Sequence, residues 1–70
     1  MSAAASIFIG VLQDQIKCWN EAALRCESVI PLLPEKKQQM DWMMVAALYR
    51  HRAKGLETII EGVSREERGT

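Results

Sequence analysis

The sequence predicts an all-α fold, a two-helix antiparallel hairpin (helix-turn-helix) that is completed by packing against a partner chain. Three observations support this prediction. Apolar residues recur at alternating spacings of four and three along two long segments, as in helices that pack along one face. The two prolines, Pro31 and Pro34, lie between these segments, where they would interrupt a continuous helix. A chain of 70 residues forms a single domain at most and buries too little surface for a large core, so a neighbouring chain is expected.

The first helix is predicted from about residue 6 to residue 30, with Ser6 as its N-cap. Its apolar positions form a seam without a charged residue, as in a coiled coil. Further apolar residues beside this seam widen the stripe, so more than one neighbouring helix is expected. The seam consists of Ala5, Ile9, Leu12, Ile16, Trp19, Ala23, Cys26, Ile30 and Leu33, and the flanking residues are Phe8, Val11, Ala22 and Val29.

The second helix is predicted from about residue 42 to residue 62, with Asp41 as its N-cap and Gly62 as its stop. Gly55 inside it is either a tolerated glycine or a place where a partner backbone approaches closely. Residues 63–70 are charged and lack an apolar period, so we expect them to fray. The seam of this helix is Trp42, Val45, Tyr49, Arg52, Leu56, Ile59 and Val63, with Ala46, Ala53 and Ile60 beside it.

Residues 31–41 form the predicted turn, and they allow two interpretations. The stretch is either an exposed polyproline ligand or the corner of the hairpin. The corner is favoured because Leu33 continues the first seam, and Leu32 and Leu33 would then close this end of the hairpin. The sequence leaves open whether the second helix begins at Pro34 or at Asp41.

The composition excludes several classes of site. Cys18 and Cys26 are separated by about 12 Å along one helix, too far for a disulfide, so we expect free, buried thiols in a reducing compartment. One histidine, His51, supplies no metal-ligand spacing, and no cofactor is expected. The formal net charge is +0, which argues against a nucleic-acid partner.

Catalysis and membrane insertion are not expected either. His51 is surrounded by cations and lacks a neighbouring nucleophile and orienting group, so we expect no enzyme and no small-molecule substrate. The apolar N-terminal stretch is shorter than the roughly 20 residues that span a bilayer and has no basic flank of a secretion signal. We therefore expect a cytoplasmic protein without stable membrane insertion.

The methionine and aromatic side chains indicate a protein partner. Methionine and aromatic residues adapt to irregular partner surfaces and anchor interfaces, and two helices can hide only one stripe from each other. Packing within the hairpin is the alternative role for the same residues. The candidate partner-binding residues are Ile9, Leu12, Ile16, Trp19, Trp42, Met43, Met44, Tyr49, Leu56, Ile59 and Ile60.

Residues 48–63, "LYRHRAKGLETIIEGV", resemble the second helix of the small YscE-type co-chaperones of bacterial type III secretion systems. In that family an aromatic residue precedes a basic-polar stretch and a motif of the form "(S/A)-K-(A/G)-L-E-(S/T)-(A/I)-I", matched here from Ala53 to Ile60. The resemblance implies a helical hairpin that binds a larger helical-repeat chaperone and helps keep the needle subunit unpolymerised. It also implies that Tyr49, Leu56, Ile59 and Ile60 carry the contact.

Two other functions remain open at this point. Two copies of the unbroken first seam would form a homodimeric four-helix bundle, for example a regulator or anti-activator that binds another protein. The stretch "SIFIGVL" is a weaker candidate for binding at a membrane surface. We favour a complex with a different protein over a homodimer, because the unpaired apolar surface exceeds what one seam accounts for.

Overall fold

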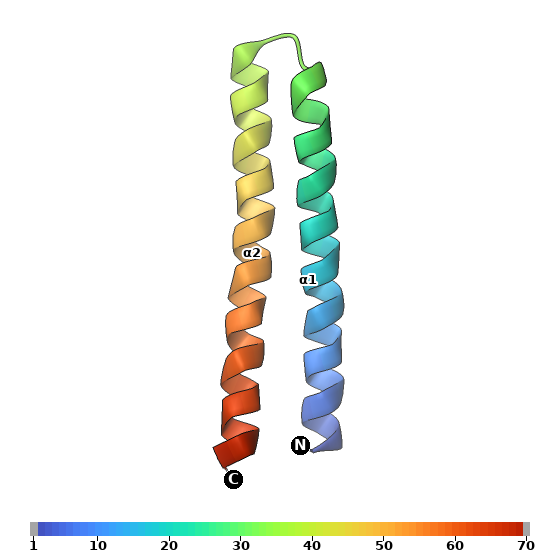
Figure 1. The fold of residues 1–70 in the computed structure, drawn as a ribbon, viewed down its shortest axis with the longest axis vertical. Helices are drawn as coiled ribbons and strands as arrows, with labels where there is room; N and C mark the ends of the chain where they lie inside the picture. Colours follow the sequence, from blue (N-terminus) through green and yellow to red (C-terminus); the bar gives the residue numbers. More distant parts are fainter. Residues whose placement is uncertain (1, 70) are drawn as a thin grey trace.

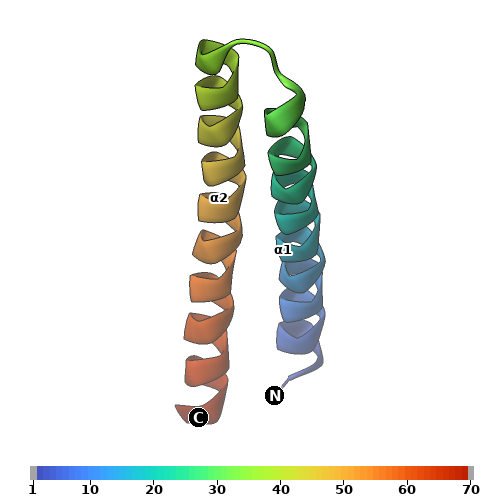
Figure 2. The same cartoon turned by 45° about the horizontal axis from the view of Figure 1, so that its top comes forward.

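The computed structural model describes residues 2–69, which form two long helices joined by a short turn. Helix α1 spans Ala3–Val29, the 3-10 turn η1 spans Ile30–Leu32, and helix α2 spans Lys36–Gly69. The helices lie side by side and antiparallel, so the described part of the chain begins and ends at the same end of the molecule (Figure 1). Figure 2 shows the same arrangement from a second direction. The predicted all-α hairpin is therefore confirmed.

The hairpin is a rod with a thin core. It measures 54 × 15 × 10 Å, and its radius of gyration is 16.1 Å, whereas a compact domain of this length has about 11 Å. No large side chain in the described residues is fully buried. Small residues dominate the contact, which allows the two helices to approach closely. The buried residues are Ala5, Ile9, Ala23, Cys26, Ala46 and Ala53.

Helix α1 begins earlier than predicted, with Ser2 rather than Ser6 as its N-cap. The Ser2 hydroxyl accepts a hydrogen bond from the Ala5 N–H at 3.1 Å, and its backbone has extended geometry. Ser6 lies inside the helix and donates its N–H to the Ser2 carbonyl at 3.0 Å. The alanines after Ser2 are the best helix formers, so they extend the helix toward the N-terminus.

Replacing Ser2 by alanine is expected to lower the free energy of unfolding by about 1 kcal/mol, because the first turn loses its side-chain acceptor. Urea unfolding followed by circular dichroism measures this change. The matched control is Ser6→Ala, which removes a hydroxyl inside the helix and should be neutral or slightly stabilising. An equal loss in both variants would contradict the assignment of Ser2 as the cap.

The proline segment forms the corner of the hairpin, but the corner is shorter than the predicted turn. Pro31 lies in the first turn of η1, and Leu33 before Pro34 is extended, as the proline ring requires. The Gln39 side chain donates a hydrogen bond to the Leu33 carbonyl at 2.9 Å and so ties α2 to the turn. The expected closure of this end by both leucines is wrong for Leu32, which is 80% exposed, whereas Leu33 is half-buried.

Helix α2 extends beyond both of its predicted ends. It begins at Lys36, close to the earlier of the two predicted starts, so Asp41 is an interior residue and not an N-cap. Gly62 does not stop the helix, which continues to Gly69. Left-handed backbone, which would end a helix at glycine, is found at no glycine among residues 2–69.

The predicted frayed tail is helical because local pairs and a contact with α1 hold it. Arg65 donates to Glu61 at 2.9 Å, a pair with the favourable order of acid before base at a spacing of four. The Glu67 carboxylate accepts hydrogen bonds from the backbone N–H and the hydroxyl of Ser2, each at 3.3 Å. The last predicted tail residue, Thr70, lies outside the described residues.

The line of contact on α2 differs from the predicted seam. Ala46 and Ala53 are buried against α1, whereas Val45, Arg52 and Ile59, which the predicted seam included, are exposed. The predicted seam follows the larger apolar residues, but close packing of two helices selects the small ones. Residues shared by both lines are Trp42, Tyr49, Leu56 and Val63.

Candidate functional site: a second apolar face

The predicted partner-binding residues divide into two groups in the structure. The first group lies in the contact between α1 and α2 and is buried or half-buried; it contains Ile9, Leu12, Ile16, Trp19, Tyr49, Leu56 and Ile60. The second group is exposed and contains Trp42, Met43, Met44 and Ile59. Only the second group is accessible to a partner while the hairpin stays closed.

An aromatic cluster occupies the middle of the hairpin contact. The rings of Trp19 and Tyr49 are stacked, with centroids 5.4 Å apart and an interplanar angle of 23°. The guanidinium of Arg52 lies 5.1 Å from the centroid of the Trp19 ring, a cation–π contact. This contact explains the charged residue that interrupts the apolar pattern of α2.

Each helix carries a second series of positions at spacings of four and three. Each of these positions directly precedes, in the sequence, a position of the hairpin contact. A step of one residue turns the position by about 100° around the helix axis, which is roughly the angle between two neighbours of a helix in a four-helix bundle. The α1 seam is Ala4, Phe8, Val11, Gln15, Cys18, Ala22, Arg25 and Val29. The α2 seam is Asp41, Val45, Leu48, Arg52, Gly55, Ile59, Gly62 and Glu66.

The two second seams lie on the same side of the hairpin. When the rod is viewed from one end, successive residues advance clockwise around one helix and counterclockwise around the other, because the helices are antiparallel. A step of one residue toward the N-terminus therefore moves from the hairpin contact to the same side of the rod on both helices. We call the sixteen positions together the second face. Its large apolar side chains are exposed: Phe8 by 46%, Val11 by 54%, Leu48 by 58% and Ile59 by 47%.

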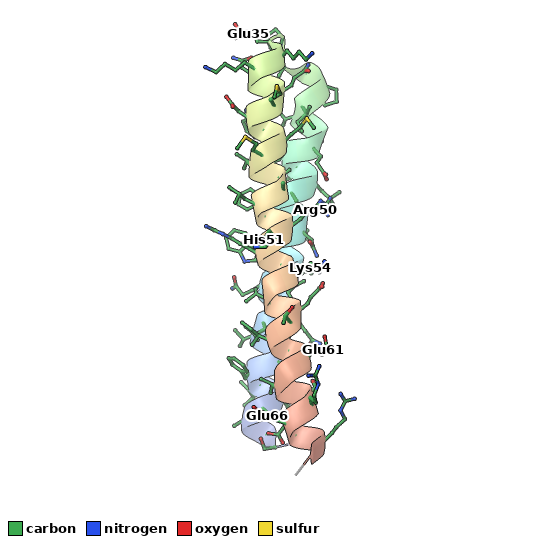
Figure 3. All side chains as sticks on the ribbon, turned by 90° about the vertical axis from the view of Figure 1, so that its left-hand side faces the viewer. Glu35, Arg50, His51, Lys54, Glu61 and Glu66 are labelled. Atoms are coloured by element: carbon green, nitrogen blue, oxygen red, sulfur yellow. The ribbon has the colours of Figure 1, made fainter. Side chains whose placement is uncertain are left out.

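The opposite edge of the hairpin is polar. Arg50, Lys54 and Glu61 project together along one edge of α2 (Figure 3). Arg50 reaches across to Glu27 of α1 and donates from two of its nitrogens to the two carboxylate oxygens. This hydrogen bond, together with the negative charge of Glu27, raises the pKa of Arg50 above its ordinary value. This edge therefore carries charged side chains that water can solvate, in contrast to the exposed apolar side chains of the second face.

Replacing Glu27 by glutamine is expected to leave the thermal unfolding midpoint unchanged within experimental error. The side chains of Arg50 and Glu27 are 45% and 43% exposed, so water and salt screen the pair and its loss removes little stability. Calorimetry at low and high salt measures the effect. A clear drop in the midpoint at low salt would contradict the assignment of this edge as a solvated surface.

A groove at the closed end adjoins the polar edge. Its volume is about 410 Å³, and the Arg50–Glu27 pair lies beside an otherwise apolar lining. Met43 and Ala47 extend this lining around α2 toward Met40 and Met44, which are exposed. The groove is open to solvent and offers room for apolar side chains of a partner rather than an enclosed ligand site.

The side chains of the described residues offer no metal site. No group of three or more histidine, cysteine, aspartate and glutamate residues within 2–69 is placed to hold an ion. Both cysteines are free thiols, and Cys26 is buried as expected, whereas the expectation is wrong for Cys18, which is exposed on the second face. Neither helix of the described segment combines the length and the apolar character needed to cross a bilayer.

The hairpin exposes more surface than a compact protein of its mass. Its accessible surface is 5395 Å², whereas a folded monomer of 7.9 kDa typically exposes about 4,400 Å². The excess of about 1,000 Å² follows from the elongated shape of the hairpin, which leaves many large apolar side chains of both helices exposed.

Sequence reasoning found part of this face. The flanking residues of the first helix, among them Phe8 and Val11, were recognised as additional apolar surface. On α2 the sequence placed Leu48 off the predicted seam, to be exposed or to meet another chain, and Leu48 is exposed. The rest of the face on α2 was missed, because Val45 and Ile59 were assigned to the hairpin contact. The signal that would have identified the face is a second series of residues at spacings of four and three, in which each residue directly precedes a contact residue.

Comparison of the chain with protein-family models, with curated proteins and with solved structures finds no match.

Proposed function

We propose that this protein is a cytoplasmic protein–protein interaction subunit whose second face packs against α-helices of another protein. The observation that carries the proposal is the continuous exposed seam on each helix, at the angle at which a bundle helix meets its second neighbour. Contiguous apolar patches on a protein surface mark interaction sites. The proposal assigns no reaction to the protein.

The most specific form of this proposal is a small co-chaperone of type III secretion. The resemblance of residues 48–63 to YscE-type proteins supports it, and a helical hairpin is the architecture which that resemblance implies. In this role the chain would bind a helical-repeat chaperone and help keep the needle subunit unpolymerised. Leu48, the first residue of the resembling segment, and Ile59 within it belong to the second face and would contact the chaperone.

Affinity isolation of the tagged chain from the cells that naturally produce it tests the proposal. Mass spectrometry should identify a helical protein that is recovered with the wild type and depleted at least about tenfold with Leu48→Asp, since a charge would have to enter an apolar contact. Lys54→Asp, on the polar edge, is the matched control and should retain the partner. A partner that survives Leu48→Asp but is lost with Lys54→Asp would contradict the proposed face.

The co-chaperone form makes a narrower prediction. The recovered partner should be a helical-repeat protein, and the needle subunit should accompany it. Recovery of a transcription factor in its place would instead identify the chain as a regulator and remove the secretion role, while the assignment of the face would stand.

A further inference from the structure

The second face is close to symmetric about its middle. The α1 seam has its midpoint between Gln15 and Cys18, and the α2 seam between Arg52 and Gly55. The contacts of Ser2 with Glu67 and of Trp19 with Tyr49 fix the relative height of the helices and place the two midpoints within about one helical turn of each other. A two-fold axis perpendicular to the rod at this level would therefore place each seam against the same seam of a second copy, running in the opposite direction.

Such an axis brings several large side chains opposite small ones, while Leu48 would meet Ile59 and Phe8 would meet Arg25 of the second copy. On α2, Val45 would meet Gly62 of a second copy, and Arg52 would meet Gly55 of that copy. A Cβ built at either glycine has no neighbour within 4 Å, so both positions offer open space to an approaching side chain. On α1, Val11 would meet the alanine at position 22 of the second copy. Matching of large with small residues is what a closely packed bundle layer needs.

The net charge and the shape of the hairpin also fit a second copy. The chain carries a formal net charge of +0, so no net repulsion opposes self-association. The hairpin is a rod with a thin core, and a second hairpin against it would cover apolar side chains that it leaves exposed. A symmetric interface requires one patch to complement itself, which the reversed seams do.

We propose that a second copy of this chain covers the second face when no other partner is bound, and that the two copies form an antiparallel four-helix bundle. In it, α1 packs against α1 and α2 against α2 of the second copy, and the closed ends lie at opposite ends of the bundle. The inference rests on the proposed function only in using the same face. A different helical protein would exchange with the second copy.

One contact of this dimer is unfavourable and provides a test. At each end of the bundle Asp41 would face Glu66 of the second copy, two acids at exposed positions. Asp41→Lys turns both repulsions into attractions, so sedimentation equilibrium should show a dimer dissociation constant about tenfold lower than that of the wild type at low salt. The control is Glu57→Lys, which makes the same change of charge away from the second face, at an exposed position on the same side of α2 as Lys54, and should leave the constant unchanged. A constant that Asp41→Lys leaves unchanged or raises would overturn the predicted register.

The glycines provide a second test, in which one substitution should stabilise the helix but weaken the dimer. Gly55→Ala improves the helix and meets no clash within the hairpin, but its methyl group occupies the space for Arg52 of the second copy. The dimer dissociation constant should rise about tenfold, while helicity at dilute concentration is retained or increased. Gly10→Ala, on α1 away from both seams, is the control and should improve the helix without weakening the dimer.

The outcomes separate this inference from the proposed function. A purified wild-type chain that remains monomeric at high concentration, yet recovers a partner from cells through Leu48, overturns the homodimer and leaves the proposed function intact. A dimer that responds to Asp41 and Gly55 as predicted supports the inference even if no partner is recovered. A monomer without any partner would remove both.

Discussion

Trp19→Ala is expected to lower the free energy of unfolding by about 3 kcal/mol, the largest effect of a single truncation in this hairpin. Trp19 stacks on Tyr49 from the opposite helix and is covered by Arg52, so it joins the two helices midway along the rod. Few large residues of the thin core can compensate, because four of the six buried positions are alanines. Urea unfolding followed by circular dichroism at a fixed chain concentration measures the loss.

Trp42→Ala is the matched control for this prediction. Trp42 lies on the same contact line near the closed end, but 39% of it is exposed, and the structure assigns it no ring contact. Its removal should therefore cost about half as much or less. Equal losses in the two variants would show that the aromatic cluster adds nothing beyond the burial of an indole ring.

Ala53→Leu is expected to destabilise the hairpin by about 2–3 kcal/mol, although it adds apolar surface. Ala53 is only 2% exposed and is buried against α1, so a longer side chain must push the helices apart or leave its preferred rotamer. The measurement is again the free energy of unfolding in urea, and a higher exchange rate of backbone amides near Ala53 should accompany the loss.

Ala47→Leu is the control for overpacking. Ala47 lies on the exposed side of the same helix, lining the shallow grooves beside the methionines, and leucine there has room. Its effect should stay within about 0.5 kcal/mol. If Ala53→Leu proved as harmless as Ala47→Leu, the close approach of the helices through alanine would be contradicted.

The sequence predicted the architecture because its two strongest signals are local. A spacing of four and three over many turns specifies a long amphipathic helix, and the proline pair specifies the corner. The helix ends were less predictable. Ser6 and Asp41 are good capping residues in isolation, but neighbouring alanines and polar helix formers continue the helix past them. Gly62 stops a helix only in the left-handed conformation, which the residues after it do not favour.

The contact line of α2 was less predictable than that of α1 for a different reason. On α1 the large apolar residues and the small buried ones lie on one line, from Ala5 to Cys26. On α2 they lie on adjacent lines, and hydrophobicity alone favours Val45 and Ile59 over Ala46 and Ala53. Distance between the helices decides between the two lines, and that distance follows from both sequences together.

The candidate site was predicted in character but not in position. The excess of methionine and aromatic residues indicated unpaired apolar surface, and Met43, Met44 and Ile59 are indeed exposed, but only Ile59 belongs to the second face. Which residues form one continuous surface depends on which side of each helix faces the other helix of the hairpin. That information became visible only once α1 and α2 were placed relative to each other, as Figures 1 and 3 show.

The two thiols allow the most direct test of the central claim, that a second copy of the chain covers the second face in the purified protein. Cys18 lies on this face and is exposed in the hairpin, whereas Cys26 is buried in the hairpin contact and serves as an internal control. The measurement is the rate at which a thiol-reactive probe modifies each cysteine in the protein as purified, compared with the same protein diluted until it is monomeric. In the assembled protein Cys18 should be protected nearly as well as Cys26, and dilution should expose Cys18 alone. Rapid modification of Cys18 at every concentration, with the protein folded and Cys26 protected, would contradict the account.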